Sequence, residues 1–273
     1  MTKNKNRKSA VREIAKSEGI GIARAGLIND RNRLASNINA AMEYERNLAW
    51  YLTATDGSKI QIHFDSDSVD TKLWSKNVIR TKRGIPHYLI DSGTQSQRFN
   101  LLDSIRGQLE LMTEASVRTL DYSSPVWMLD GFLLMHKARL KDLATYGVKS
   151  HAELRARLIA EYGIEEIKNA RKYFFLFIYD WDVLMADASE EVKNQVRFLI
   201  EHGKKTGIHI IASTGGGYAE VRGGNENAMT KSIVVQKPNA TGDEYALINH
   251  DGVWTRLQVP VEFKPQNSDV TSV

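Results

Sequence analysis

Two aspartates, Asp180 and Asp182, directly follow the apolar run Tyr173–Tyr179. Carboxylates at the end of a buried strand are ligands that Mg²⁺ prefers, so this pair is the first candidate for catalytic chemistry. A second apolar run, Ile208–Ser213, follows the helical segment Glu190–His202. This order of strand, helix and strand predicts a parallel sheet, whose ligands lie at the carboxyl ends of its strands.

The same two aspartates also allow a purely structural interpretation. Alternation along an extended strand would send Asp180 and Asp182 to opposite faces, and an aspartate after a strand commonly caps the next helix. The chain has no cysteine, and its seven histidines show no pair at a metal-binding spacing. We therefore predict no resident metal site. His209, inside the second apolar run, is expected to be a packed core residue.

The segment Gly207-Ile-His-Ile-Ile-Ala-Ser-Thr-Gly215 resembles a strand of the FtsK/SpoIIIE DNA-pumping ATPases. In that family, a strand that ends in Asp-Glu-aromatic is followed by a helix and then by Gly-Ile-His-Leu-Ile-Leu-Ala-Thr-Gln. Weaker matches lie at Pro86–Leu89 and Met135–Lys149, so the resemblance covers about residues 84–235. It implies a RecA-like, P-loop-type α/β fold, in which helices flank a parallel sheet.

The resemblance also locates the family's phosphate loop, Gly-x-Thr-Gly-Ser-Gly-Lys-Ser, at Ser92–Phe99. The strand Pro86–Asp91 would precede this loop, and a helix would open at Asn100. Thr94 and Ser96 match the pattern, whereas serine or glutamine replaces each of the three glycines. The candidate cofactor-binding residues are Gly93, Thr94, Gln95, Ser96, Gln97, Arg98 and Phe99.

The substitutions in this loop have physical consequences. Glycine allows the positive φ angles and the close backbone approach that wrapping a phosphate requires, and glutamine does not. Arg98 keeps the charge of the family's lysine, but it is a wide planar fork instead of a compact ammonium. Phe99 has no oxygen for magnesium. We therefore expect the loop to survive as a structural element without its phosphate chemistry.

The acidic strand departs from the family in either alignment. If Asp180 is the metal-site aspartate, Trp181 stands at the catalytic glutamate; if Trp181 is the family's aromatic residue, Tyr179 and Asp180 replace the acidic pair. Gly215 stands at the sensing glutamine. The resemblance thus implies a hydrolysis-inactive member, for which we expect no cofactor; ATP and magnesium would bind only if the altered loop still works. An unrelated α/β protein with ordinary strand-to-loop junctions is the alternative.

Positive charge gathers at the N-terminal end. Residues 1–35 carry nine basic and three acidic side chains, a net charge of +6, whereas the remainder carries 28 basic and 30 acidic, a net charge of −2. Such a concentration predicts contact with nucleic acid. The candidate DNA-contacting residues are Lys3, Lys5, Arg7, Lys8, Arg12, Lys16, Arg24 and Arg31.

Two short helices around Gly19 are expected in this basic arm, one containing Val11–Ala15 and one containing Ile22–Ile28. Their spacing allows a helix-turn-helix that reads bases, but a helical arm that touches phosphates without sequence preference is the preferred interpretation. A further helix is expected at Asn37–Leu48. A hairpin follows, Ala49–Ala54 and Lys59–Phe64, with Asp56-Gly57 in a type I′ turn.

We expect four segments: a basic arm at 1–35, a helix and hairpin at 36–72 with a polar linker at Ser66–Asp70, the FtsK-like α/β domain at 73–265, and a polar tail at 266–273. The expected parallel strands are Tyr88–Asp91, Val117–Asp121, Phe174–Asp180, His209–Ser213 and Ser232–Gln236. A closing hairpin is expected at Tyr245–Asn249 and Val253–Val259. The glycine-rich stretches at 214–217 and 222–224 are expected to be mobile surface loops; the resemblance implies contact with DNA phosphates as the alternative.

Bulk properties narrow the setting. The chain has 273 residues with ordinary hydrophobic and charged fractions, and its longest apolar runs are too short to cross a bilayer. With no secretory signal and no cysteine, a cytoplasmic location is expected. The sequence therefore predicts a DNA-binding, FtsK/SpoIIIE-like pseudo-ATPase that handles DNA, as such proteins of mobile elements do. Its expected partners are DNA, further copies of itself or an active homologue; an active DNA translocase and a helix-turn-helix regulator are the alternatives.

Overall fold

The computed structural model describes residues 2–18, 22–64, 88–91, 93–215, 231–235, 245–250 and 253–260. The expected linker Ser66–Asp70, the start of the loop strand at Pro86, the glycine-rich stretch at 222–224 and the tail at 266–273 lie outside these residues.

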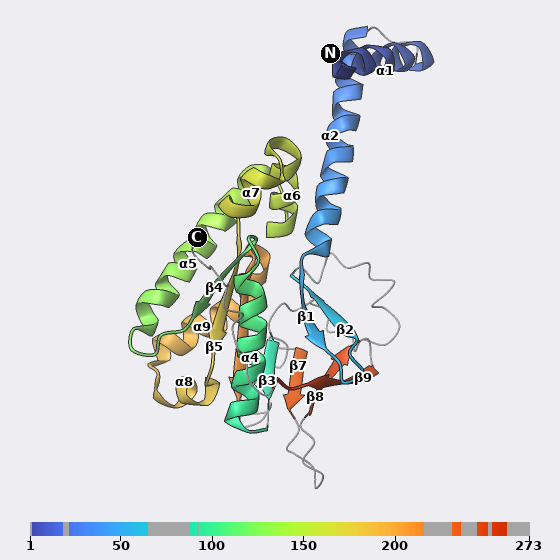
Figure 1. The fold of residues 1–273 in the computed structure, drawn as a ribbon. Helices are drawn as coiled ribbons and strands as arrows, with labels where there is room; N and C mark the ends of the chain where they lie inside the picture. The colour runs from blue at the N-terminus through green and yellow to red at the C-terminus, as the bar shows by residue number, and fades with distance from the viewer. Residues whose placement is uncertain are drawn as a thin grey trace, which may run out of the picture.

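A seven-stranded sheet forms the centre of the molecule, in the order β4-β5-β6-β3-β7-β8-β9 (Figure 1). Its first five members pair in parallel, and β8 and β9 continue the sheet antiparallel. This confirms the predicted α/β fold, and each predicted parallel strand is present. The bounds are β3 Tyr88–Asp91, β4 Ala115–Thr119, β5 Tyr173–Ile178, β6 Ile208–Thr214, β7 Lys231–Val235, β8 Tyr245–His250 and β9 Val253–Gln258.

Helices cover both faces of the sheet. One apolar core joins β3, β5 and β6 to α4 (Gln95–Glu110) and to a small hairpin of β1 (Ala49–Thr53) and β2 (Lys59–His63). A second core joins the opposite face to three helices. These are α5 (Pro125–Tyr146), α8 (Trp181–Asp187) and α9 (Glu190–His202), and the 3₁₀ turn η1 (Gly203–Thr206) follows α9.

The hairpin packs on the main domain. Trp50, Ile62 and Phe64 are buried, and the Phe64 ring meets Tyr173 and Phe175 edge to face. Its turn differs from the expected type I′. The N–H of Gly57 donates to the carbonyl of Ala54 (2.9 Å), so Asp-Gly occupies the last two turn positions, and Gly57 has φ +84°. The five-residue connection is too long for a two-residue I′ turn.

The basic arm consists of α1 (Thr2–Glu18) and α2 (Ile22–Asn47). Figure 1 shows α2 leaving the body as a long rod, with α1 lying across its far end. The expectation of two separate helical segments after Gly19 is wrong, because α2 runs through both of them and across the expected boundary at residue 35. Residues 29–36 contain no glycine or proline to interrupt a helix. The short second helix of the helix-turn-helix hypothesis is therefore absent.

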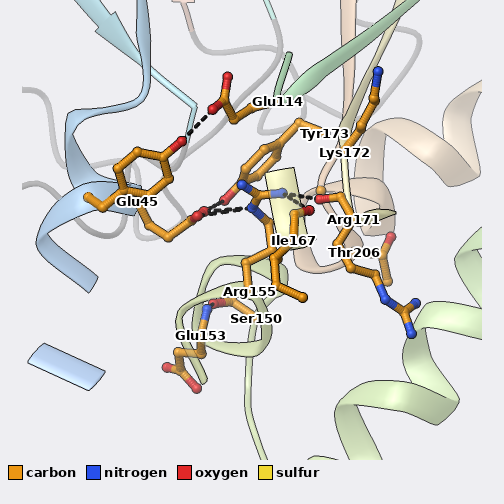
Figure 2. A network of polar contacts seen from close by, with 12 residues as sticks. Glu45, Glu114, Ser150, Glu153, Arg155, Ile167, Arg171, Lys172, Tyr173 and Thr206 are labelled. Carbon is orange, nitrogen blue, oxygen red and sulfur yellow. Dashed lines mark hydrogen bonds and ion pairs between the residues drawn. The ribbon is translucent and has the colours of Figure 1, made fainter. Parts of the chain in front are cut away.

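The base of α2 is anchored by α6 (His151–Tyr162) and α7 (Ile164–Ala170) and by a buried polar cluster (Figure 2). Nε of Arg155 donates to both carboxylate oxygens of Glu45 at 3.0 Å, and neither side chain reaches solvent. The hydroxyl of Tyr173 donates to the same carboxylate at 2.8 Å. Helices α2 and α6 and strand β5, which are distant in sequence, thus meet at the carboxylate of Glu45.

The Gly-Ile-His sequence at the start of β6 has a structural explanation. Gly207 has φ +69°, and a Cβ there would lie 2.4 Å from Cδ2 of His151. Glycine is required both for the backbone angle and for this close approach. The ring of His209 is buried and stacks on Phe175, with 4.8 Å between ring centroids, which confirms its predicted role in the core.

Candidate functional site

The carboxyl ends of β3, β5 and β6 bring the predicted site residues together. Asp91 pairs in register with Thr214, and Ile178 pairs with Ala212, so the segments that follow these strands meet at one edge of the sheet. Nε2 of Gln95 donates to Oδ2 of Asp180 at 2.8 Å. The altered phosphate loop and the acidic segment are therefore in direct contact.

The helix after the loop begins earlier than expected. It starts at Gln95 instead of Asn100, with Thr94 as its N-cap. The N–H of Gln97 donates to Oγ1 of Thr94 (3.2 Å), and the N–H of Thr94 donates to Oε1 of Gln97 (2.9 Å). This reciprocal capping box occupies two backbone donors with side chains of the chain itself. In a phosphate-binding loop, donors at this position point at the ligand.

Arg98 is directed into the protein. Only 6% of the residue is exposed, and Nη1 donates to the carbonyl of Gly93 at 3.0 Å. A Cβ added at Gly215 would lie 3.0 Å from Nη2 of Arg98. The absence of a side chain at Gly215 therefore makes room for the guanidinium. Arg98 and Gly215, which the resemblance aligns with the family's lysine and its sensing glutamine, therefore fit each other sterically.

Phe99, which the resemblance aligns with the family's magnesium-binding serine or threonine, makes an aromatic contact. Its ring meets that of Tyr179 edge to face, with 5.1 Å between centroids. The hydroxyl of Tyr179 donates to Asp103 on α4. Burial is the main cause that raises the pKa of Tyr179, and this hydrogen bond is the second. The phenol stays protonated at neutral pH and remains a donor. This end of α4 is joined to the acidic segment by packing.

Asp182 is held by the end of β6. Its Oδ1 accepts from Oγ1 of Thr214 and its Oδ2 from the N–H of Gly215, both at 2.6 Å. The alternation argument does not apply to Asp180 and Asp182, because β5 ends at Ile178 and both residues lie at the start of α8. Asp180 occupies the N-cap position of α8, although its side chain makes no capping hydrogen bond.

Sequence reasoning missed two parts of this site. The capping box has a recognisable signature, Thr94-x-x-Gln97, which the comparison with a phosphate loop obscured. Tyr122 carried no signal, because it lies 58 residues from its partner. Its hydroxyl donates to the carbonyl of Asp180 (2.9 Å) and accepts from the N–H of the same residue (3.0 Å), which fixes the backbone at the acidic segment.

The basic arm presents a separate group of charges. Lys8, Arg12 and Lys16 recur at every fourth residue of α1, and all three are exposed, whereas Val11 is buried. Arg24 and Arg31 are exposed on α2. Lys3, Lys5 and Arg7 lie within α1. The arm rises from the body, so these charges lie far from α8, whose N-cap is Asp180 (Figure 1).

The sequence matches no protein-family model and no curated protein. Solved structures do match the fold. The cytoplasmic domain of the Thermomonospora curvata type VII secretion ATPase EccC is 12% identical, with a TM-score of 0.57 over 79% of this chain and 29% of that chain. The pCW3 conjugation coupling protein TcpA, solved with ATPγS, is 16% identical, with a TM-score of 0.56 over 79% of this chain and 67% of that chain. ATPases 2 and 3 of EssC from Geobacillus thermodenitrificans are 12% identical, with a TM-score of 0.50 over 80% of this chain and 46% of that chain.

The chain shares its fold with these ATPase and coupling-protein structures. It spans less than a third of the matched EccC chain, less than half of EssC and about two thirds of TcpA. Within the residues that the structure describes, no helix is long and apolar enough to cross a membrane. The same residues contain no cluster of three or more histidine, cysteine, aspartate or glutamate side chains that could hold a metal ion.

Proposed function

We propose that this protein is a non-hydrolysing member of the P-loop ATPase fold that handles DNA, contacting phosphates through its basic arm. The observation that supports the loss of hydrolysis is that polar groups of the altered phosphate loop form hydrogen bonds with one another. Thr94 and Gln97 cap each other, and Arg98 donates to the loop's own carbonyl. The side chains that would contact a nucleotide in a P-loop are thus engaged with the protein.

The residues do not fit a magnesium-bound triphosphate. Phe99 offers no oxygen to the metal and packs on Tyr179. Both oxygens of Asp182 accept hydrogen bonds from Thr214 and Gly215. A magnesium ion there would compete with these two donors for the carboxylate, and each hydrogen bond to a charged group that it displaced would cost roughly 1.5–3 kcal/mol.

Calorimetric titration with ATP and magnesium, beside a DNA-stimulated ATPase assay, tests the first half of the proposal. We expect neither heat of binding nor turnover. Micromolar binding with turnover that Arg98→Ala abolishes would instead establish an active translocase with a non-standard loop. Asn194→Ala, on the exposed side of α9, is the matched control for this variant and should behave like the unaltered protein.

The second half rests on the alignment of Lys8, Arg12 and Lys16 along α1. Neutralising a phosphate releases counterions, so each contact adds about 0.9 to the slope of log affinity against log salt on duplex DNA. Replacing all three residues by alanine should weaken binding to unrelated duplexes equally and lower the slope by roughly 2.7. Fluorescence anisotropy over a salt series measures both quantities.

Lys137→Ala, an exposed residue on α5, serves as the control for the arm and should leave the salt slope unchanged. If the arm variant binds DNA as the unaltered protein does, the arm is not the DNA contact. If it loses affinity for one sequence only, base reading would replace the phosphate-contact proposal.

A further inference from the structure

The outer side of α5 carries an exposed apolar stripe. Trp127 is 79% exposed and Leu134 is 66% exposed, although tryptophan and leucine are normally found in cores or interfaces. The two lie seven residues apart, on one helical face. Gly131 lies between them, and a Cβ there would meet nothing within 4 Å. The stripe therefore consists of two large apolar side chains, and the residue between them, Gly131, has no side chain.

The outer half of α2 carries a stripe of the same length. Leu27 is 74% exposed and Leu34 is 46% exposed, again seven residues apart, with Arg31 on the same face between them. The same face continues toward the body as Ala41 and Glu45, which are buried in the anchoring contact with α6. The face of α2 that packs on a helix at its base is thus solvent-exposed farther out.

The two stripes are complementary in charge as well as spacing. Asp130 is exposed beside Gly131, and its Oδ1 accepts from Nε2 of Gln195 at 2.8 Å. No salt bridge joins Asp130 or Arg31 to another side chain in the part of the chain that the structure describes. The α5 pair has the acidic Asp130 near its middle. The α2 pair has Asp30 and Arg31 there, but Asp30 already forms a salt bridge with Arg33 at 3.9 Å, so Arg31 is the basic group that α2 offers.

We infer that the arm of one copy packs its Leu27–Leu34 stripe against the Trp127–Leu134 stripe of a second copy, with Arg31 paired to Asp130. Helices that pack on each other bury stripes of this kind. The arm of the same copy does not reach the α5 stripe, because α2 rises beside α6 while α5 begins at the opposite end of the molecule (Figure 1). Each copy offers one stripe of each kind, so the contact is heterologous. It requires neither nucleotide nor DNA and stands independently of the proposed function.

Light scattering during size-exclusion chromatography of the full chain, without DNA or ATP, tests this inference. We expect the mass to rise with protein concentration. Leu27→Glu and Trp127→Glu should each remain monomeric, because each places a charge inside the contact. Leu111→Glu is the control, since Leu111 is 85% exposed at the far end of α4 and should not alter the association.

Mixing the two monomeric variants gives the decisive result. Leu27→Glu retains an intact α5 stripe and Trp127→Glu retains an intact arm, so an equimolar mixture should form a one-to-one dimer. Formation of that dimer also shows that both variants are folded. Arg31→Glu and Asp130→Arg should each weaken association at least tenfold, and the combined charge reversal should restore it.

Three outcomes would overturn the inference. The unaltered protein could stay monomeric at all concentrations, the stripe variants could associate normally, or the mixture of variants could fail to form a dimer while both show native circular dichroism. An unchanged association in an Arg12→Glu variant that binds DNA poorly would separate this interface from the DNA contact.

Discussion

Removing the charge of Glu45 should destabilise the protein more than any exposed substitution. Three hydrogen bonds converge on its carboxylate, two from Nε of Arg155 and one from the hydroxyl of Tyr173 (Figure 2). Both members of the ion pair are fully buried. Glu45→Gln preserves the shape of the side chain but directs an amide donor toward donors, and it leaves the guanidinium without a counter-charge.

Breaking a buried pair from one side typically costs about 3–5 kcal/mol, because the remaining charge is still out of water. This is a large share of the roughly 5–15 kcal/mol that stabilises a typical domain. At about 2–4 °C per kcal/mol for a chain of this size, the melting temperature should fall by roughly 6–20 °C. Replacing Glu45 and Arg155 by leucine and methionine, together with Tyr173→Phe, should recover much of this loss, because no buried charge remains, although the carbonyl of Arg171 loses the donor that Arg155 supplied.

Urea unfolding followed by circular dichroism, on the single and combined variants, measures these free energies of unfolding and the coupling between them. A loss below about 1 kcal/mol for Glu45→Gln would refute the reasoning, since that is the range of an exposed ion pair. The pair Arg106 and Glu110 on the surface of α4 supplies the control, and Glu110→Gln should fall within that lower range.

Three further predictions concern Gly207, His151 and Thr94. Gly207→Ala should cost at least about 2 kcal/mol of unfolding free energy, because its Cβ would meet His151 at 2.4 Å, whereas Gly147→Ala, which has φ +63° and open space, should cost only about 1 kcal/mol. Burial lowers the pKa of His151 well below its ordinary value, so its contribution to stability is complete well above about pH 6.5 and is lost on acidification; His151→Phe should reduce the slope of stability against pH below pH 6.5 by at most about 1.4 kcal/mol per pH unit in urea titrations. Thr94→Ala removes the acceptor of the capping box and should lower the melting temperature by an amount equivalent to about 1 kcal/mol, whereas Ser96→Ala, two residues later and exposed, should have little effect.

The sheet could be predicted because each parallel strand is a short apolar run that ends in polar residues. Periodicity identified the runs that became β5 and β6, and their separation by one helix fixed a parallel pairing. The resemblance to FtsK-like motifs predicted the same fold that the solved ATPase structures share. His209 was assigned to the core for the same reason, because an isolated histidine inside such a run has no exposed side to occupy.

The arm was harder to predict, because its helices have weak amphipathic patterns. Positive charge located the arm, but only the structure shows one continuous helix from Ile22 to Asn47. Charge is additive along a sequence, whereas the length of a helix depends on whether anything interrupts it and on what its base packs against. For α2 that support is the pairing of Glu45 with Arg155, which lies 110 residues away.

The amino-acid sequence shows which residues depart from the family's phosphate-loop pattern, whereas the contacts that these residues make are visible only in the folded chain. Gln97 caps its own helix, Arg98 lies beside Gly215, and Asp182 accepts from the end of β6. The contact of Gln97 is local, whereas Arg98 and Asp182 meet the end of β6 because the register of β3, β5 and β6 brings these segments together. Residue type fixes which bonds a side chain can make, but the packing of the sheet fixes which partner is near enough to make them.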